Sequence, residues 1–171
     1  MADTTKSVPK GRGRVASLSL PVPFFHPLAL LRMGKGAPRG FWAREGRWFA
    51  HVGQVATVSV DSRRTSQDRY SAVWDDAGHV LNGAVAKGVH GVLPMAPRFF
   101  GGFSFQEEHL ARGVWDGFPS ARFVLPEMEL MGEKETVVLT LRRFVESSAD
   151  MEDIYRELEE RSEGLLDSLQ A

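Results

Sequence analysis

The chain lacks cysteine, long apolar runs and an excess of charge of either sign. The absence of cysteine excludes a disulfide framework, a thiolate metal site and a cysteine nucleophile. No apolar run approaches the roughly 20 residues that a membrane-spanning helix needs. The apolar stretch near the N-terminus is short and is broken by Pro21 and Pro23, whereas a signal peptide needs an unbroken one. We therefore expect a cytoplasmic protein that does not bind a membrane.

The net charge of the 171-residue chain is −1, so no overall field attracts nucleic acid or an anionic membrane. What the chain does have is apolar mass, because 43% of its residues are hydrophobic, which is enough for one domain with its own core. Residues 1–17 differ from the rest, since they are basic and nearly devoid of apolar side chains. We predict a flexible basic arm over residues 1–17 and one folded domain over residues 18–171.

Two β-hairpins are predicted from alternating aromatic and β-branched residues. The first turns at Glu45-Gly46, and its second strand places His51 and Phe49 on the face opposite Trp48, Ala50 and Val52. A histidine in mid-strand with no second ligand nearby is interpreted as a packed side chain rather than a catalytic one. The second hairpin turns at residues 132–134.

Three helices are predicted between and after these strands, so the fold class is α+β, with antiparallel hairpins and packed helices. A short helix ends near Gly34, with Leu28 and Leu31 facing inward. A long helix spans residues 65–87, capped by Thr65 or Ser66 and ended by Gly88, with Tyr70, Trp74 and either Val80 or Leu81 among the inward residues. An acidic helix capped by Ser148 or Asp150 closes the chain, with an apolar stripe of Met151, Ile154 or Tyr155, Leu158, Leu165 and Leu169.

The segment "RFFGGFSF", residues 98–105, permits two interpretations. It partly fits the aromatic strand with which RNA-recognition domains stack bases. However, Glu107 and Glu108 follow directly, where a nucleic-acid platform needs basic residues. A packed inner strand of a sheet, with Phe99, Phe103 and Phe105 on one face, is the preferred interpretation.

Other chemical motifs are weak. "GRGRVA" follows a polar segment instead of the strand that a dinucleotide-binding loop requires. "EEHLARG" has Phe105 where an inverted zinc motif needs histidine. Glu127 and Glu129 share one strand face, but on the outer side of a hairpin both would be in water and would not divide into an acid and a base. We assign no catalytic, cofactor-binding or metal-binding residue.

The run "WDGFPSARFVLPEMEL", together with "FWAREGRWFAHVG" and "RFFGGFSF", resembles the N-terminal region of isochorismate synthases, members of the wider chorismate-utilising family. The resemblance follows the order of Pro27-Leu28, Phe41-Trp42, the 65–87 helix, Phe100 to Phe105 and Gly117 to Pro126, and it covers roughly residues 20 to 169. It implies that the chain is half of a layered α/β/α sandwich whose other half is the C-terminal chorismate-binding domain.

The resemblance also implies where the chemistry of such an enzyme resides. In the family a lysine, a glutamate and magnesium-binding acids act in the C-terminal domain, so magnesium is expected for the full-length enzyme and no cofactor for this chain. The implied function is the N-terminal domain of an enzyme that converts chorismate to isochorismate for menaquinone or siderophore biosynthesis, not catalytic by itself. The alternative is a stand-alone binding or regulatory module that pairs with a separate chorismate-binding chain. Self-association through exposed aromatic residues is a further expectation.

Overall fold

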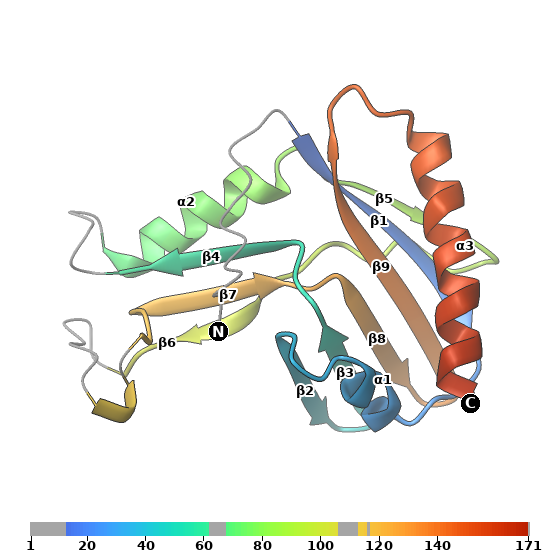
Figure 1. Ribbon diagram of the computed structural model, residues 1–171, viewed down its shortest axis with the longest axis horizontal. Coiled ribbons are helices and arrows are strands. Elements are labelled where there is room, and N and C mark those ends of the chain that lie inside the picture. The colour runs from blue at the N-terminus through green and yellow to red at the C-terminus, as the bar shows by residue number, and fades with distance from the viewer. Residues whose placement is uncertain (1–12, 62–67, 106–112, 116, 171) are drawn as a thin grey trace.

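The computed structural model describes residues 13–61, 68–105, 113–115 and 117–170. These residues form two β-sheets and three α-helices, which confirms the predicted α+β class (Figure 1). Neighbouring strands are antiparallel, except for one pair at one edge of the larger sheet, which is parallel. The helices lie outside the sheets, so strand residues provide most of the interior.

The larger sheet has six strands in the order β2-β3-β8-β9-β1-β5. Their bounds are β1 Gly13–Val22, β2 Arg39–Arg44, β3 Arg47–Val52, β5 Val85–Gly88, β8 Met128–Glu133 and β9 Thr136–Glu146. The two long strands, β1 and β9, are paired over ten residues and form its centre. The order brings the start of the chain beside its last strand, a long-range pairing that only the tertiary structure can stabilise.

The smaller sheet has three strands in the order β4-β7-β6. Their bounds are β4 Ala56–Val60, β6 Phe100–Phe103 and β7 Ala121–Leu125. The chain first passes from the larger sheet to the smaller after β3, through Gly53, and returns for the last time after β7, through Glu127; between these crossings it visits the larger sheet once, at β5. The Val55 N–H donates to the Leu125 oxygen and joins these two crossings, and the Arg142 N–H of β9 donates to the Glu127 oxygen of the second.

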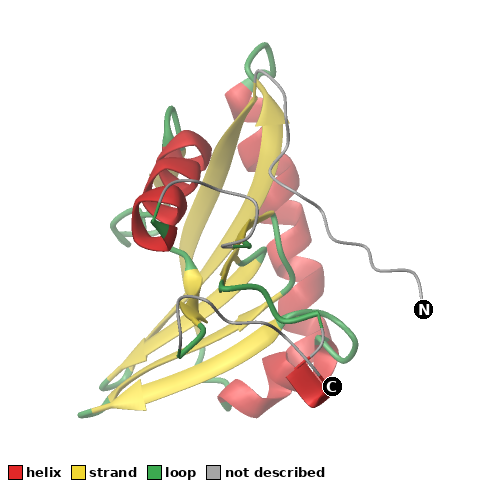
Figure 2. Ribbon diagram, turned by 90° about the vertical axis from the view of Figure 1, so that its left-hand side faces the viewer, coloured by secondary structure: helices red, strands yellow, loops and turns green. Residues whose placement is uncertain are grey.

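Each helix covers a different part of the sheets (Figures 1 and 2). Helix α1, Pro27–Met33, packs against β3, and helix α2, Arg69–Leu81, lies over β4 of the smaller sheet. Helix α3, Met151–Gln170, runs along β1 and β9. Its first turn carries acidic residues, and the Glu152 N–H donates to Asp150 Oδ1 at 2.9 Å, as expected for a capped helix start.

Strand β1 contributes to two apolar cores because its side chains alternate in direction. Leu18 points to the core under α3, where Leu141 and Leu158 are also buried. Val15 points to the core under α2, which also contains Val80. Ile154, Tyr155, Leu158 and Leu165 are buried, which confirms the predicted stripe of α3 where its side chains are described.

Both predicted hairpins are confirmed. Glu45-Gly46 connects β2 to β3 with positive φ at both residues. The second turn lies slightly later than predicted, because Glu133 still pairs with Thr136 and Lys134, at φ 54°, is the first turn residue. Tight two-residue turns of this kind match the right-handed twist of the strands they join.

The predicted helix over residues 65–87 is wrong at its C-terminal end. Helix α2 ends at Leu81, Asn82 has an extended conformation, and Gly83 has φ +74°. The chain then forms β5, which pairs in parallel with β1. Glycine adopts positive φ without steric cost, so the turn stops the helix where the apolar periodicity alone would continue it. At the other end Asp68 accepts from the Tyr70 and Ser71 N–H groups, while Thr65 and Ser66 lie outside the described residues.

The predicted inward face of α2 is only partly correct. Val80 is buried, but Trp74 is 81% exposed and Tyr70 is 55% exposed. Arg69 is buried instead and donates to the Ser104 backbone oxygen at 2.8 Å. Its guanidinium also lies 5.6 Å from the centre of the Phe103 ring, so this arginine joins α2 to the end of β6.

Strand β1 begins within the segment predicted as an arm. Residues 13–17 belong to β1, and Val15 and Ser17 are fully buried, so the boundary at residue 17 is wrong. The strand pairs with β9 from Gly13 onward. Residues 1–12 lie outside the described part. The end of "GRGRVA" is thus a sheet strand and not a loop that leads directly into a helix.

We predict that Leu158→Ala lowers the free energy of unfolding by about 2–5 kcal/mol, because it removes a buried side chain and leaves a cavity under α3. Urea denaturation measures the change. Glu160→Ala, at an exposed position of the same helix, is the control and should unfold like the parent. Equal effects of the two substitutions would show that α3 does not pack on the sheet as described.

Candidate functional site

Polar side chains form a row across the face of the larger sheet that points away from α3. The strand register places them side by side on four adjacent strands. In strand order they are His51 on β3, Glu129 on β8, Thr140 on β9 and Ser19 on β1. Glu129, Thr140 and Ser19 are at most 1% exposed, and the Ser19 and Thr140 hydroxyls are hydrogen-bonded at 3.1 Å. Buried polar groups in adjacent strands are costly unless paired, so the row requires partners.

A buried ion pair lies beside this row. Arg142, on β9, is 0% exposed, and its Nη2 donates to Glu129 Oε2 at 2.7 Å. Arg98, in the segment before β6, places Nε 3.3 Å from Glu129 Oε1. The Arg98 guanidinium also lies 4.8 Å from the centre of the Phe49 ring. One carboxylate therefore connects two strands of the larger sheet to the segment that leads into the smaller one.

The sequence interpretation of Glu129 as a solvated residue is wrong, because β8 is an inner strand rather than the outer arm of a lone hairpin. Glu127 precedes β8 and forms an ion pair with Arg161 of α3. The two glutamates therefore have different surroundings. Arg142 and Arg98 were missed, although alternation along β9 indicates that Arg142 points away from the face of Leu139 and Leu141.

His51 has a restricted environment at the end of the row. Its ring stacks on Phe100 at 4.4 Å between centres. A Cβ at Gly40, the opposite residue on β2, would lie 2.4 Å from His51 Nε2, so only glycine leaves space for the ring there. Burial lowers the pKa of His51, and Arg142 lowers it further, while Glu129 acts in the opposite direction. The imidazole is therefore held mainly neutral and packs against β6.

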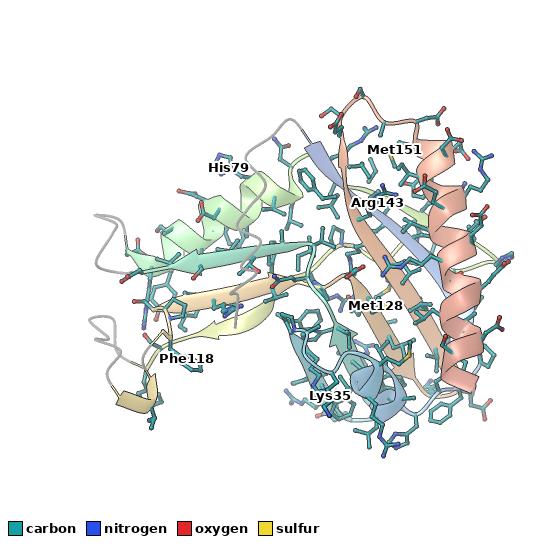
Figure 3. All side chains as sticks on the ribbon, in the orientation of Figure 1. Lys35, His79, Phe118, Met128, Arg143 and Met151 are labelled. Atoms are coloured by element: carbon teal, nitrogen blue, oxygen red, sulfur yellow. The ribbon has the colours of Figure 1, made fainter. Side chains whose placement is uncertain are left out.

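An open groove of about 830 Å³ lies beside His51, between the smaller sheet and the β2–β3 edge of the larger one. The groove is mostly apolar, with arginines at its margins. Its lining includes Phe100, Phe103, Phe105, Phe118, Arg39 and Arg122. Figure 3 shows Phe118 at the end of the smaller sheet, far from α3. A volume of this size lies within the range of small-molecule and docking sites.

The segment "RFFGGFSF" forms a strand, but it is an edge strand, so its prediction as an inner strand is wrong. Strand β6 pairs only with β7 among the described strands. Phe103 contacts Tyr70 and Phe123, yet it is 38% exposed, and Phe105 is fully exposed. These rings border the groove instead of filling a core.

The other residues considered as possible metal ligands form no further site within the described part of the chain. His79, labelled in Figure 3, lies on α2, where its Nδ1 is 2.7 Å from the Asp75 backbone oxygen. Residues 106–112, which contain most of "EEHLARG", lie outside the described part. Among the described residues, no group of three or more histidine or acidic side chains is placed to hold a metal ion. No helix in the described part is long and apolar enough to cross a membrane.

Comparison with known protein families identifies the chain as a member of one family. The profile described as "Chorismate binding enzyme" matches residues 3–171, nearly the whole chain. The chain therefore belongs to the chorismate-binding enzyme family. A comparison with curated proteins gives no match.

We predict that Glu129→Gln lowers the free energy of unfolding by about 3–5 kcal/mol, because it leaves the buried Arg142 cation uncompensated. The double variant Glu129→Leu, Arg142→Met removes both charges and should be more stable than Glu129→Gln alone. The control is Glu133→Gln, which breaks the exposed Arg47–Glu133 pair and should unfold like the parent. Urea denaturation of the parent and the three variants measures these free energies of unfolding. A Glu129→Gln variant as stable as Glu133→Gln would contradict the buried pair.

We also predict that acid weakens the fold through His51. Its folded-state pKa is lowered from 6.5, so the unfolded chain takes up a proton first as the pH falls. The free energy of unfolding should therefore decrease as the pH falls from 6.5 to the folded-state pKa, and be fully retained above 6.5. His51→Phe, which keeps a ring against Phe100, should reduce this decrease. Titration of the His51 ring by NMR checks the cause, and a midpoint above 6.5 would contradict it.

Proposed function

We propose that the chain is the N-terminal domain of an isochorismate synthase and acts in the cytoplasm with a C-terminal chorismate-binding domain. Membership of the chorismate-binding enzyme family supports the general class. The order of the Phe41-Trp42, Phe100–Phe105 and Gly117–Pro126 motifs supports the isochorismate branch. In this proposal the chain is not catalytic by itself, and the isochorismate formed by the complete enzyme enters menaquinone or siderophore biosynthesis.

The observation that carries the proposal is the exposed aromatic surface around the groove. Phe105 is fully exposed, Phe118 is 60% exposed, and Trp42 on the outer strand β2, whose ring lies 5.5 Å from that of Phe49, is about half exposed. Clustered exposed rings of this kind usually mark a surface that another protein covers. We assign this surface to the catalytic domain, in the same polypeptide or in a separate chain, with which it would complete the α/β/α sandwich.

The described residues do not fit the magnesium ion that the resemblance implies for the complete enzyme. Magnesium prefers clustered carboxylate oxygens. The carboxylates of the site are engaged otherwise, because Glu129 is paired with Arg142 and Glu127 with Arg161. No group of acidic and histidine side chains in the described ranges is placed to bind a metal. We therefore derive no metal-dependent step for this chain and assign magnesium to the catalytic domain.

We predict that the chain alone does not convert chorismate, whereas the chain with the chorismate-binding catalytic domain of its own source yields isochorismate in the presence of magnesium. Chromatography of the products after incubation with chorismate measures both. Isochorismate formed by the chain alone would contradict its non-catalytic role. Salicylate or anthranilate formed by the pair would contradict the isochorismate assignment.

The docking surface is tested separately by substitution of one exposed ring. Phe105→Asp should weaken association with the catalytic domain at least tenfold, because it places a charge on the apolar margin of the groove. The matched control is Phe24→Asp, at a ring that is 65% exposed and does not line the groove. Analytical ultracentrifugation of the mixture gives both affinities. Equal affinities of the two variants for the catalytic domain would contradict this docking surface. Self-association of the chain without binding to the catalytic domain would favour a stand-alone module.

A further inference from the structure

Strand β6 leaves one edge of the smaller sheet open. Figure 1 shows it on the outer side of β7, and no other described strand pairs with it. The Ser104 N–H donates to the Ser120 oxygen at 2.8 Å, so these two residues are a hydrogen-bonded pair of the antiparallel ladder. Such pairs alternate along a ladder, so the backbone polar groups of Gly102 point to β7, whereas those of Gly101 and Phe103 point to the open edge.

The other edge strands of the two sheets are protected, whereas β6 has no such protection among the described residues. An exposed edge is a template for pairing, so natural sheets place charged residues on it or cover it. In the larger sheet β2 carries Arg39 and Arg44, and β5 carries Lys87. In the smaller sheet β4 is mostly buried and packs against α2. The sequence of β6, "FGGF", contains neither a charge nor a proline, which is typical of a strand that another element covers.

The glycines of β6 make its backbone accessible from the groove. A Cβ at Gly101 would lie 2.0 Å from the Arg122 backbone oxygen, so the close approach of β6 to β7 requires glycine there. A Cβ at Gly102 would meet no atom of the described residues within 4 Å outside its own chain neighbours, although Gly102 lines the groove. This space beside a bare backbone suits the close approach of another chain.

The described lining of the groove also specifies the charge of a partner. It includes Arg39 and Arg122 and no acidic residue. Arg39 already donates to the Leu31 backbone oxygen at 2.7 Å, whereas Arg122 is exposed and lies opposite Gly102 in the register. Because Gly102 has no side chain, the Arg122 guanidinium can extend across it toward the open edge. An acidic side chain on an added strand matches this cation.

We propose that the open edge of β6 receives a β-strand of the catalytic domain, an apolar extended segment that carries an acidic side chain. Backbone hydrogen bonds with Gly101 and Phe103 supply affinity, and the aromatic margin and Arg122 supply specificity. The inference rests on the proposed function, since it names the element of the catalytic domain that occupies the groove.

Amide hydrogen exchange of the ¹⁵N-labelled chain, alone and with the chorismate-binding catalytic domain of its own source, is the first test. In the free chain the Gly102 amide should be protected by β7, while the Gly101 and Phe103 amides exchange fast. When the catalytic domain is bound, exchange at Gly101 and Phe103 should slow by roughly tenfold or more. Binding in sedimentation without this slowing would overturn the added strand and leave the proposed function standing. Absence of binding would contradict both.

The second test separates the backbone hydrogen bond from the side chain. Phe103→Ala removes the ring, whereas Phe103→Pro removes the ring and also the N–H that points to the open edge. Proline is tolerated at such an edge position, because no bond to β7 is lost. Phe103→Pro should bind the catalytic domain roughly tenfold more weakly than Phe103→Ala, because a backbone acceptor of the partner is left unsatisfied. Equal affinities of the two variants would overturn the proposal.

A third variant tests the position of the added strand. Gly102→Val fills the space over the β6 backbone, and a β-branched side chain suits a strand, so the chain alone should be at least as stable as the parent in urea. Its affinity for the catalytic domain should fall by roughly tenfold, because the strand can no longer approach closely. Unchanged affinity would place the catalytic domain elsewhere and overturn the proposal.

Discussion

The buried ion pair of Arg142 and Glu129 is the contact on which the rest of the structure depends. It joins the two inner strands β8 and β9 at the place where the chain leaves for the smaller sheet. Because Glu129 also faces Arg98, and Arg98 lies over Phe49, the same carboxylate fixes the segment that leads into β6. A pair that is removed from water gains little net stability, but loss of either partner is severe. Its value here is to specify how the two sheets are arranged.

That arrangement produces two surfaces with different chemistry. On one side, His51 stacked on Phe100 joins the larger sheet to β6, and the rings beyond this contact form the margin of an open groove. On the other, the gap beside β9 is lined by arginines that are each paired with a glutamate. An aromatic margin of this kind suits a protein partner.

The sequence predicts the local features of this fold well. Both hairpins follow from alternation and glycine-containing turns, and α3 follows from its acidic cap and apolar stripe. Features that depend on distant strands are predicted poorly. The N-terminal strand β1 looks like part of an arm because Arg14 interrupts its apolar pattern, and only pairing with β9 and β5 explains its burial. The helix predicted over residues 65–87 is too long for the same reason, because the segment after Gly83 forms a strand only by pairing with β1.

The candidate site was not predictable by motif. The sequence alone indicates a solvated Glu129, because it shows neither that β3 pairs with β8 nor that Arg142 on β9 forms an ion pair with this carboxylate. Alternation alone indicates that Arg142 points away from Leu139 and Leu141, but it does not indicate which partner that arginine meets. The aromatic segment was correctly predicted as a strand and incorrectly as an inner one, since the number of neighbours of a strand is set by the whole sheet.

Hydrogen exchange of the arginine side chains tests the central claim most directly. If Arg142 is held between the strands as described, its Nε–H should exchange with solvent far more slowly than that of Arg47, whose pair with Glu133 is exposed. Both resonances are observable in one ¹⁵N-labelled sample. Slow exchange at Arg142 and fast exchange at Arg47 would support the buried pair as the organising contact. Equally fast exchange at both would contradict it.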